Sequence, residues 1–170
     1  MKILRGLAAF SAAMILAVLS FGTSPARIAA DAAVAQNMAG MKFINFSALP
    51  TCAKGAVLNG DPMHGPSLMV VKFAAGCSVP WHWHTANERV MMASGVGVVQ
   101  MNGGKPVALR PGGYAFAPAQ HVHRFRCSGP CTIFILSDGA FDIHYVGSHG
   151  QEISPEAALK AVRERPAPGM

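Results

Sequence analysis

Five side chains in two short segments have the types and spacing of a metal site. His82 and His84 are two residues apart, and Glu88 follows four residues later. In an extended strand, residues two apart point to the same face, so these two imidazoles share one side of the chain. A second segment carries His121 and His123 with the same spacing. Imidazole and carboxylate groups together bind divalent transition metals, so the pattern predicts such a site.

The segments that carry these residues contain few charged side chains, which strengthens the metal interpretation. A lone His on an apolar face is most often an ordinary hydrogen-bonded residue, but four of the seven His lie in these two pairs. A buried carboxylate at Glu88 would be costly unless it met a cation or took up a proton. Three imidazoles and one carboxylate would leave coordination positions open on the metal, as a catalytic site requires. This donor set accepts Fe(II), Mn(II), Ni(II), Cu(II) or Zn(II).

Positioning these side chains requires strands, and the surrounding sequence predicts many of them. Short runs rich in β-branched and aromatic residues alternate with Gly, Pro and Asn. The expected strands cover residues 42–46, 68–74, 79–84, 88–93, 96–101, 107–109, 114–117, 121–126, 132–136 and 141–146. Strands that are this short and closely spaced predict an all-β antiparallel sandwich or barrel.

One helix is expected after the strands. Ser154 can cap it, Pro155 suits its first position, and Pro166 stops it after residue 165. The chain then divides into four parts. They are an export signal at residues 1–35, an N-terminal loop and strand segment at 36–66, the barrel at 67–146, and a C-terminal helix and tail at 147–170.

The first 35 residues have the features of a secretory signal peptide. Lys2 and Arg5 precede an apolar run at residues 7–21, and the sequence Ala-Val-Ala at 33–35 fits the small-x-small cleavage rule. Cleavage after Ala26 and an uncleaved membrane anchor are the alternatives, although the run is short for a span. We therefore expect a periplasmic or secreted protein with no membrane contact after cleavage. A chain exported unfolded would load its metal outside the cell membrane, where the affinity order favours copper or zinc.

Export would place the four cysteines in an oxidising compartment, where disulfides form. Cys127 and Cys131 flank a Ser-Gly-Pro turn between two strand-like runs, so a hairpin would bring their Cβ atoms within disulfide reach. Cys52 and Cys77 then remain as the second pair. Four free thiols are the alternative, and a cysteine metal site is disfavoured because no second thiol pair lies near the hairpin.

The charge content excludes several classes of protein. Charged residues make up 13% of the chain and hydrophobic residues 51%, which is unlike disordered chains or coiled coils. The formal net charge is +6, and it falls to +4 without residues 1–35, which hold three basic residues and one acidic residue. The basic residues are scattered and form no stripe for a phosphate backbone, so we expect no nucleic-acid partner.

The first metal segment resembles the first motif of the cupin superfamily. That motif has the form Gly-x5-His-x-His-x3-Glu-x6-Gly, and this chain matches every fixed position. The matching residues are Gly76, His82, His84, Glu88 and Gly95.

The second metal segment is similar to the second cupin motif, Gly-x5-Pro-x-Gly-x2-His-x3-Asn, with two departures. Gly112, Pro118 and His123 match, whereas Gln120 stands in place of the second Gly and Cys127 in place of the Asn. The departures leave the metal-binding His in place. They change the residue at a turn and put a disulfide-capable cysteine at the last position. The resemblance covers roughly residues 60–146.

The resemblance implies a jelly-roll barrel, the double-stranded β-helix of cupins. A single motif pair implies a single barrel. It also implies that His82, His84, Glu88 and His123 bind one divalent metal. Cupins include dioxygenases, isomerases, decarboxylases, epimerases, sensors and storage proteins, so the resemblance leaves the reaction open.

We expect an oxygenase-like oxidoreductase that acts on a small neutral organic substrate, because few charged residues alternate onto the inner face. Glu88 and His121 are the candidates for moving protons, and His121 is otherwise a hydrogen-bond partner of the site or part of its polar rim. The alternatives are a non-enzymatic metal-dependent protein that binds or senses a small molecule, and a cupin isomerase or lyase. An occluded barrel that holds a purely structural metal is a further alternative.

The remaining aromatic and His side chains receive simpler interpretations. Trp81 and Trp83 face away from the metal side of their strand, so they would cover a homodimer interface or pack under the N-terminal segment. His64, His144 and His149 have no metal-ligand spacing in the sequence, and we expect none of them to bind metal.

Overall fold

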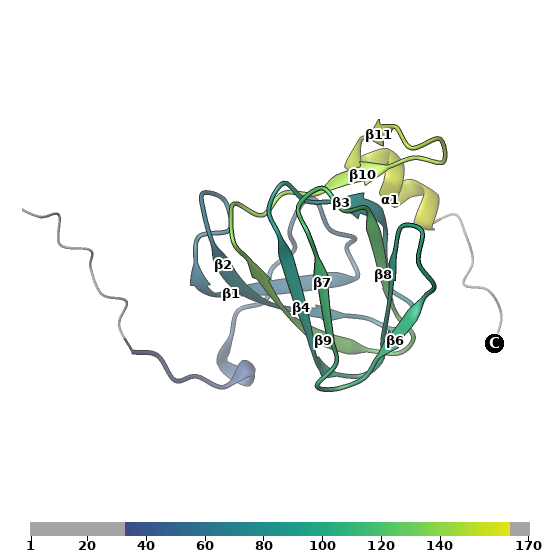
Figure 1. The fold of residues 1–170 in the computed structure, drawn as a ribbon. Coiled ribbons are helices and arrows are strands. Elements are labelled where there is room, and N and C mark those ends of the chain that lie inside the picture. The colour runs from purple at the N-terminus through teal and green to yellow at the C-terminus, as the bar shows by residue number, and fades with distance from the viewer. Residues whose placement is uncertain (1–32, 164–170) are drawn as a thin grey trace, which may run out of the picture. The chain divides into compact units, whose positions relative to one another are not determined.

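The computed structural model describes residues 33–163 as two antiparallel β-sheets and one short α-helix (Figure 1). The first sheet has the strand order β1-β2-β9-β4-β7, and the second has the order β11-β10-β3-β8-β5-β6. The elements are the 3-10 helix Met38–Gly40, β1 (Ala53–Gly60), β2 (Ser67–Phe73), β3 (Ser78–Trp83), β4 (Glu88–Ser94), β5 (Gly97–Met101), β6 (Val107–Leu109), β7 (Tyr114–Ala117), β8 (His123–Cys127), β9 (Cys131–Ser137), β10 (His144–Val146), β11 (Glu152–Ile153) and α1 (Pro155–Arg163). The predicted all-β fold with a C-terminal helix is confirmed, and the two sheets are consistent with a jelly roll.

Alternation along the strands decides which side chains face the interior. In β4, Glu88, Val90 and Met92 are buried, whereas Met91 between them is exposed. In β8 the same alternation buries His123. The inward apolar side chains of both sheets form one core cluster. Because side chains alternate with a period of two, a shift of one residue in either strand would turn Glu88 or His123 out to solvent.

A β-bulge interrupts the ladder between β3 and β8. Pro80 and Trp81 together lie opposite a single residue, Arg124. Proline is tolerated at a bulge because it has no N–H to donate to the ladder. The extra residue lets Val79 and His82 both face the interior, with 4% exposure each, although they are three residues apart.

The structure differs from the predicted strands mainly on the N-terminal side. Residues 42–46 do not form a strand, and only an isolated bridge joins Ile44 to Gly55. No strand is expected at residues 53–60, because Gly55 and the run Asn59-Gly60 favour loop, yet Ala53–Gly60 forms β1 by pairing with β2. Pairing with a neighbouring strand outweighs the weak local preference of these residues. Residues 141–143 were expected in a strand but precede β10.

Two disulfides join segments at one end of the sheets. Cys52 is bonded to Cys77, and their Cα atoms are 5.7 Å apart. Cys127 is bonded to Cys131 across the turn between β8 and β9, with a Cα separation of 5.9 Å. These are the two pairs that the hairpin interpretation of the sequence predicts.

The C-terminal helix α1 begins where the sequence predicts. The Ser154 hydroxyl accepts a hydrogen bond from the Ala157 N–H at 3.2 Å and so caps the first turn. The helix contacts β3 and β10 of the second sheet. Among the described residues, no helix is long and apolar enough to span a bilayer. The predicted export signal lies outside the described residues, except for its last three positions.

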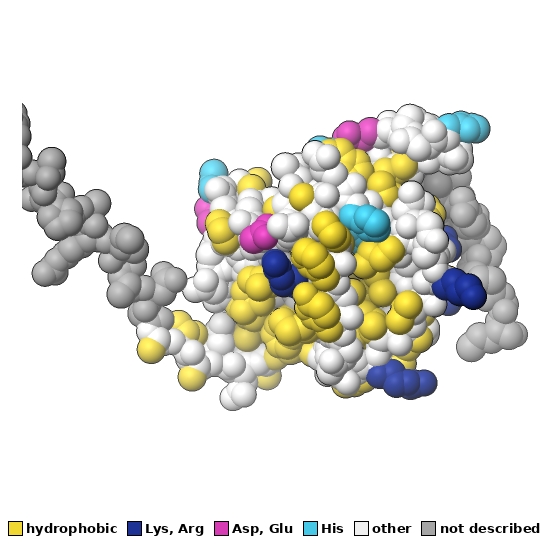
Figure 2. Space-filling view, in the orientation of Figure 1, with side chains coloured by type: hydrophobic (Ala, Val, Ile, Leu, Met, Phe, Trp, Pro, Cys, Tyr) yellow, Lys and Arg dark blue, Asp and Glu magenta, His cyan; other side chains and the backbone are white. Residues whose placement is uncertain are grey.

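The outer face of the first sheet carries a patch of exposed apolar side chains, visible over β4 and β7 in Figure 2. Tyr114 is 54% exposed, Met91 and Phe116 are 41% exposed, and Leu136 is 38% exposed. Met91 lies opposite Tyr114 in the ladder. The Arg89 guanidinium lies 4.9 Å from the centre of the Phe116 ring and adds one positive charge to the patch.

Candidate metal centre

Strands from both sheets bring the four predicted ligands together inside the fold. His82 in β3 lies opposite His123 in β8, and Glu88 begins β4 in the other sheet. His84 directly follows β3. All four side chains are buried, and the most exposed, Glu88, is only 6% accessible. One ring nitrogen from each of the three His lies within 4.8 Å of the other two.

Each of the three imidazoles is oriented by a backbone carbonyl. A carbonyl oxygen only accepts hydrogen bonds, so in each pair the Nδ1 of the ring must carry the proton. The pairs are His82 Nδ1 to Pro80 O at 2.6 Å, His84 Nδ1 to Asp142 O at 2.5 Å, and His123 Nδ1 to His121 O at 2.9 Å. In a neutral ring this arrangement leaves the lone pair on Nε2, which is how proteins present His to a metal.

The Nε2 atoms of His84 and His123 lie beside the Glu88 carboxylate. His123 Nε2 lies 3.2 Å from Glu88 Oε2, and His84 Nε2 lies 3.6 Å from Glu88 Oε1. His84 Nε2 is buried and has no hydrogen-bond partner. His123 Nε2 can donate to Glu88 only if the ring carries a second proton, because its first proton is already on Nδ1. The cluster is therefore rich in acceptors and short of donors, and a divalent cation fits it.

Burial and charge oppose one another in this cluster. Burial by itself would raise the pKa of Glu88, but the charge of His84 and the hydrogen bond from His123 lower it to about 2. Burial would lower the pKa of His123, but the hydrogen bond to Glu88 and its negative charge outweigh burial and raise it. Burial and the neighbouring His123 and His84 hold the pKa of His82 well below its usual value. Glu88 is therefore an anion and His82 a neutral ring at neutral pH.

The four side chains line a cavity between the two sheets. The centre of a water molecule has about 30 Å³ of this cavity open to it, so the cavity has room for water. The other lining residues are all apolar: Leu49, Phe73, Val79, Val90, Val99, Met101, Ala115, Ala117, Phe125, Ile133, Ile135, Phe141 and Ile143. The polar side chains of the cavity lining are therefore only His82, His84, Glu88 and His123.

His121, the second predicted proton carrier, does not line the cavity. It precedes β8, which begins at His123 rather than at residue 121, and its side chain is partly buried. Its backbone carbonyl accepts the Nδ1 proton of His123. His121 thus meets the site through its main chain.

The turn before His121 shows how the chain accommodates a departure from the second cupin motif. Gln120 stands where the motif has Gly, and it adopts a φ of 62° in the left-handed region that favours Gly. Its N–H donates to the carbonyl of His84 at 2.8 Å. The turn keeps the glycine-like conformation and links the two metal segments. Cys127, the other departure, is fully buried and held in its disulfide.

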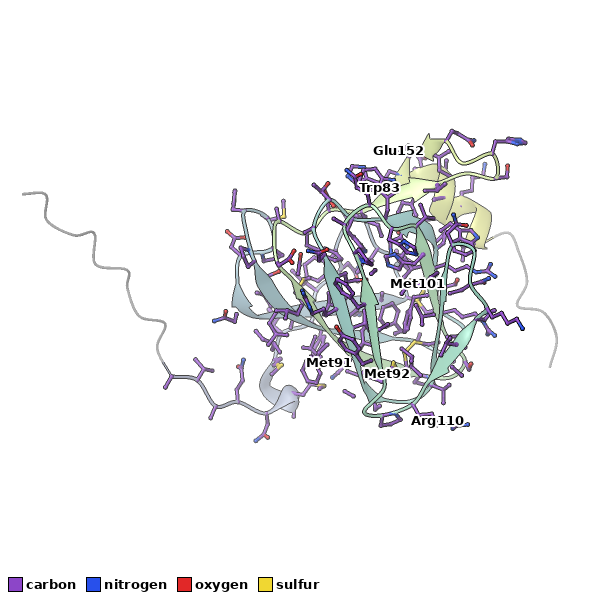
Figure 3. All side chains as sticks on the ribbon, in the orientation of Figure 1. Trp83, Met91, Met92, Met101, Arg110 and Glu152 are labelled. Carbon is purple, nitrogen blue, oxygen red and sulfur yellow. A yellow bond between two sulfur atoms is a disulfide. The ribbon has the colours of Figure 1, made fainter. Side chains whose placement is uncertain are left out.

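The two tryptophans and His144 lie on the other side of β3. The Trp83 ring is stacked on His144 at 3.9 Å between ring centres, and the Arg124 guanidinium lies 4.7 Å from the centre of the Trp81 ring. His144 also contacts the Glu152 carboxylate, and Figure 3 shows Trp83 and Glu152 at the same end of the second sheet. Each tryptophan therefore contacts another side chain of the chain, and both remain partly exposed. Among the described residues, only His82, His84 and His123 lie close enough together to hold a metal ion. His144 is not part of this cluster.

Sequence reasoning missed Asp142, whose carbonyl orients His84. Its side chain also holds the neighbouring backbone, because Oδ1 accepts the N–H of Thr85 at 2.8 Å and Oδ2 lies 3.2 Å from His144 Nε2. The contact with His84 spans 58 residues and uses a main-chain atom. A main-chain acceptor leaves no trace in residue type, so no sequence pattern could have indicated it.

Comparisons with known proteins agree with the fold and the motifs. A family model described as a cupin domain matches residues 69–137. The chain is 31% identical over 100 residues to the DNA damage-repair/toleration protein DRT102 of Arabidopsis thaliana, a match that covers 58% of this chain. The matched region makes up only 30% of the length of that relative.

Three solved structures have a similar fold. The polyketide cyclase RemF from Streptomyces resistomycificus is 15% identical with a TM-score of 0.64, over 79% of this chain and 95% of that one. An RmlC-like cupin from Shewanella frigidimarina is 17% identical with a TM-score of 0.51, over 61% and 88% of the two chains. The DMSP lyase DddQ from Ruegeria pomeroyi is 24% identical with a TM-score of 0.51, over 59% and 57%. Residues 69–137 of this chain therefore match the cupin-domain family, in agreement with the motifs and the fold.

Proposed function

We propose that the chain binds one divalent transition metal through His82, His84, Glu88 and His123. The observation that carries this proposal is the buried Nε2 of His84. This atom has no hydrogen-bond partner, although it lies beside the other atoms of the cluster that could bind a metal. A cation would satisfy this nitrogen, the other imidazole lone pairs and the carboxylate at once. Copper or zinc is favoured over iron, manganese or nickel if the metal is loaded outside the cell membrane.

For the reaction, we propose oxygenase-like oxidoreductase chemistry on a small organic substrate that is largely apolar and neutral in solution. A bound redox-active metal with open positions would supply electron transfer between the substrate and dioxygen. The apolar walls would hold the body of the substrate and exclude water. Glu88 is the carboxylate within reach of a substrate proton, whereas His121 would act only by orienting His123 through its carbonyl.

A non-redox reaction is the second candidate. Two structures with this fold are titled as a lyase and a polyketide cyclase, and a Lewis-acidic metal in the same cavity would serve an isomerase or a lyase. A non-enzymatic binding or sensing role is the third candidate, in which the apolar lining would hold a small molecule beside the metal.

The test begins with protein purified from its native compartment without added metal. We expect elemental analysis to find close to one transition-metal ion per chain. Oxygen uptake with small phenols or diketones would then support the oxygenase, and product formation without oxygen uptake would support the isomerase or lyase. A retained ligand that is never turned over would support the binding protein. Protein that holds no metal and takes up neither copper nor zinc would contradict the site itself.

We also propose that the protein is exported to the periplasm or secreted. The two disulfides support this location, because such bonds persist in oxidising compartments. Mass spectrometry of the mature N-terminus should find cleavage after Ala35 or, in the alternative, after Ala26. A cytosolic protein that retains Met1 would contradict the proposal.

A homodimer is the proposed assembly, and the apolar patch on the first sheet supports it. Met91, Tyr114 and Phe116 would contact the same residues of a second copy around a twofold axis. β7 is the edge strand of that sheet, so an antiparallel copy could extend the sheet at the same place. Light scattering of the wild type and of Met91→Asp tests this proposal, since only the wild type should have the mass of a dimer.

A further inference from the structure

Three adjacent strands of the second sheet, β8, β5 and β6, carry cations on and beside their outer face. Residues 89–137 include these strands and contain five basic residues but no Asp or Glu. Arg124 and Arg126 lie two residues apart on β8, and both are exposed on the side opposite its buried residues. Lys105 and Arg110 are exposed just before and just after β6, which pairs with β5 beside β8. Strand pairing therefore gathers four cations that are scattered in the sequence, and we call this surface the basic face.

Carboxylates in the described part of the chain do not neutralise the basic face. None of its four cations forms an ion pair within residues 33–163, whereas Arg89 on the first sheet pairs with Asp138 at 3.5 Å. Figure 2 shows Lys and Arg side chains along the right edge, where β6 lies, and Asp and Glu at the top and left. The acidic residues of 33–163 all lie outside β5, β6 and β8: they are Asp61, Glu88, Asp138, Asp142, Glu152 and Glu156.

The guanidinium of Arg124 is held in place before any ligand binds. Its Nε and one terminal nitrogen donate to Oε1 of Gln100 at 3.0 Å and 2.6 Å, and the group lies 4.7 Å from the centre of the Trp81 ring. A side chain that is already ordered loses less conformational entropy when it binds an anion. The other terminal nitrogen makes no hydrogen bond within residues 33–163 and is available to a carboxylate.

We propose that the basic face binds a carboxylated polysaccharide. Residues two apart in a strand are separated by about 7 Å, so Arg124 and Arg126 can meet neighbouring acidic groups of one polymer at the same time. Ser78 lies opposite Arg126 in the ladder and adds a hydroxyl that can bond to a sugar. The occupant is therefore a polymer whose negative charges repeat along its length, and this role is separate from the proposed metal site.

An anionic bilayer and nucleic acid fit the basic face less well. A surface that binds a bilayer presents large apolar side chains that insert between the lipids. Among the described exposed large apolar residues, only Val107 lies on these three strands, and Met91, Tyr114 and Phe116 lie on the other sheet. The proposed export would keep the protein away from intracellular nucleic acid. Both partners are included in the test as competing outcomes.

The experiment compares carboxymethyl-dextran with unmodified dextran, two polymers that share one backbone and differ in charge. Binding is measured with protein purified from its native compartment, at low ionic strength. We expect carboxymethyl-dextran to bind at least about tenfold more tightly than dextran. This preference should be lost at about 1 M salt, where charges are screened beyond about 3 Å. Equal binding of the two polymers, a preference that salt does not change, or tighter binding to phosphatidylglycerol vesicles or duplex DNA would overturn the proposal.

A matched pair of double variants separates the basic face from net charge. Arg124→Gln/Arg126→Gln and Lys54→Gln/Lys72→Gln each remove two positive charges, and Lys54 and Lys72 are exposed opposite one another on the first sheet. The first variant should bind carboxymethyl-dextran at least about tenfold more weakly, and the second within about twofold of the wild type. Equal losses would refute the proposal. If circular dichroism shows that the Arg124 change prevents folding, Arg110→Gln/Arg126→Gln replaces it with the same expected loss.

The variant His84→Ala keeps this proposal apart from the metal site. The basic face and the cavity lie on opposite sides of β8, because Arg124 is exposed where His123 is buried. Protein without metal should therefore bind carboxymethyl-dextran as the wild type does. Loss of polymer binding in folded His84→Ala would place the polymer at the cavity and contradict the basic face.

Discussion

At the scale of single residues, the direction of three imidazole rings decides what the site can bind. Each ring is held by a carbonyl at Nδ1, so the remaining nitrogen is directed toward the other two rings and Glu88. Residue types alone would allow either nitrogen to face the cavity. The hydrogen bonds select Nε2 and place its lone pair where a cation can use it.

His84→Ala is expected to abolish metal binding, whereas His144→Ala should keep the metal content of the wild type. His84 faces the cluster, but both ring nitrogens of His144 are taken by the carboxylates of Asp142 and Glu152. Elemental analysis of the two purified variants provides the measurement, and circular dichroism confirms that each is folded. Equal metal contents in the two variants would contradict the ligand assignment.

His144 should make stability depend on pH. Burial would lower its pKa, but hydrogen bonds and charges from Glu152 and Asp142 outweigh burial and raise it above 6.5. Because the pKa of His144 is higher in the folded state, its protonated ring stabilises the folded state at pH values below the unfolded-state pKa of 6.5. This stabilisation is lost as the pH rises through the pKa of the folded state. Urea unfolding should therefore show the wild type more stable than Glu152→Gln near pH 6, with the difference shrinking by pH 9. A difference that does not change with pH would refute this expectation.

At the scale of elements, a segment outside the strands positions part of the site. Residues 138–143 connect β9 to β10 and lie against the turn between His84 and Glu88. Asp138 accepts hydrogen bonds from the backbone and side chain of Asn87 at 2.9 Å and 2.7 Å. The Asp142 carboxylate accepts a hydrogen bond from the backbone N–H of Thr85 at 2.8 Å. The segment therefore fixes both ends of the turn between His84 and Glu88, two of the proposed ligands.

Asp142→Ala is expected to weaken metal binding by about 10–100-fold, the usual effect of removing support behind a ligand. The carbonyl of residue 142 remains in this variant, but its position is no longer fixed by the bond to Thr85 N–H. Asp142→Asn keeps an oxygen that can accept this bond, so it should restore most of the affinity. Competition with a chelator measures the metal dissociation constants. Equal losses in both variants, or no loss in either, would show that Asp142 does not position His84.

At the scale of the whole molecule, two covalent links secure the same end of the sheets. Cys52–Cys77 spans 25 residues and ties the beginning of β1 to the turn before β3. Cys127–Cys131 spans only four residues and closes the hairpin between β8 and β9. A disulfide that closes a longer loop restricts the unfolded chain more. The Cys52–Cys77 bond should therefore contribute more to stability than the Cys127–Cys131 bond.

Replacing Cys52 and Cys77 together by Ser should lower the free energy of unfolding by about 3–4 kcal/mol, from the chain entropy of the loop. The corresponding change at Cys127 and Cys131 should cost about 2 kcal/mol through the same effect. Urea unfolding of both double variants, compared with the wild type, tests the order. A larger loss at Cys127 and Cys131 would show that packing of these buried sulfurs outweighs loop entropy.

The sequence by itself determined the features that depend on local spacing. The pairs His82/His84 and His121/His123, with Glu88 nearby, predicted a metal cluster, because a strand repeats its side chains every two residues. Most strands, the helix start at Pro155 and the all-β class followed from equally local patterns of residue type.

Only the tertiary structure decided the features that join distant segments. It formed β1 from a Gly-rich segment, placed the bulge at Pro80, left His121 out of the cavity lining, and brought the carbonyl of Asp142 to His84. The physical reason is that these features depend on strand pairing and main-chain hydrogen bonds. Such bonds use atoms that every residue carries, so the order of side chains does not reveal where they form.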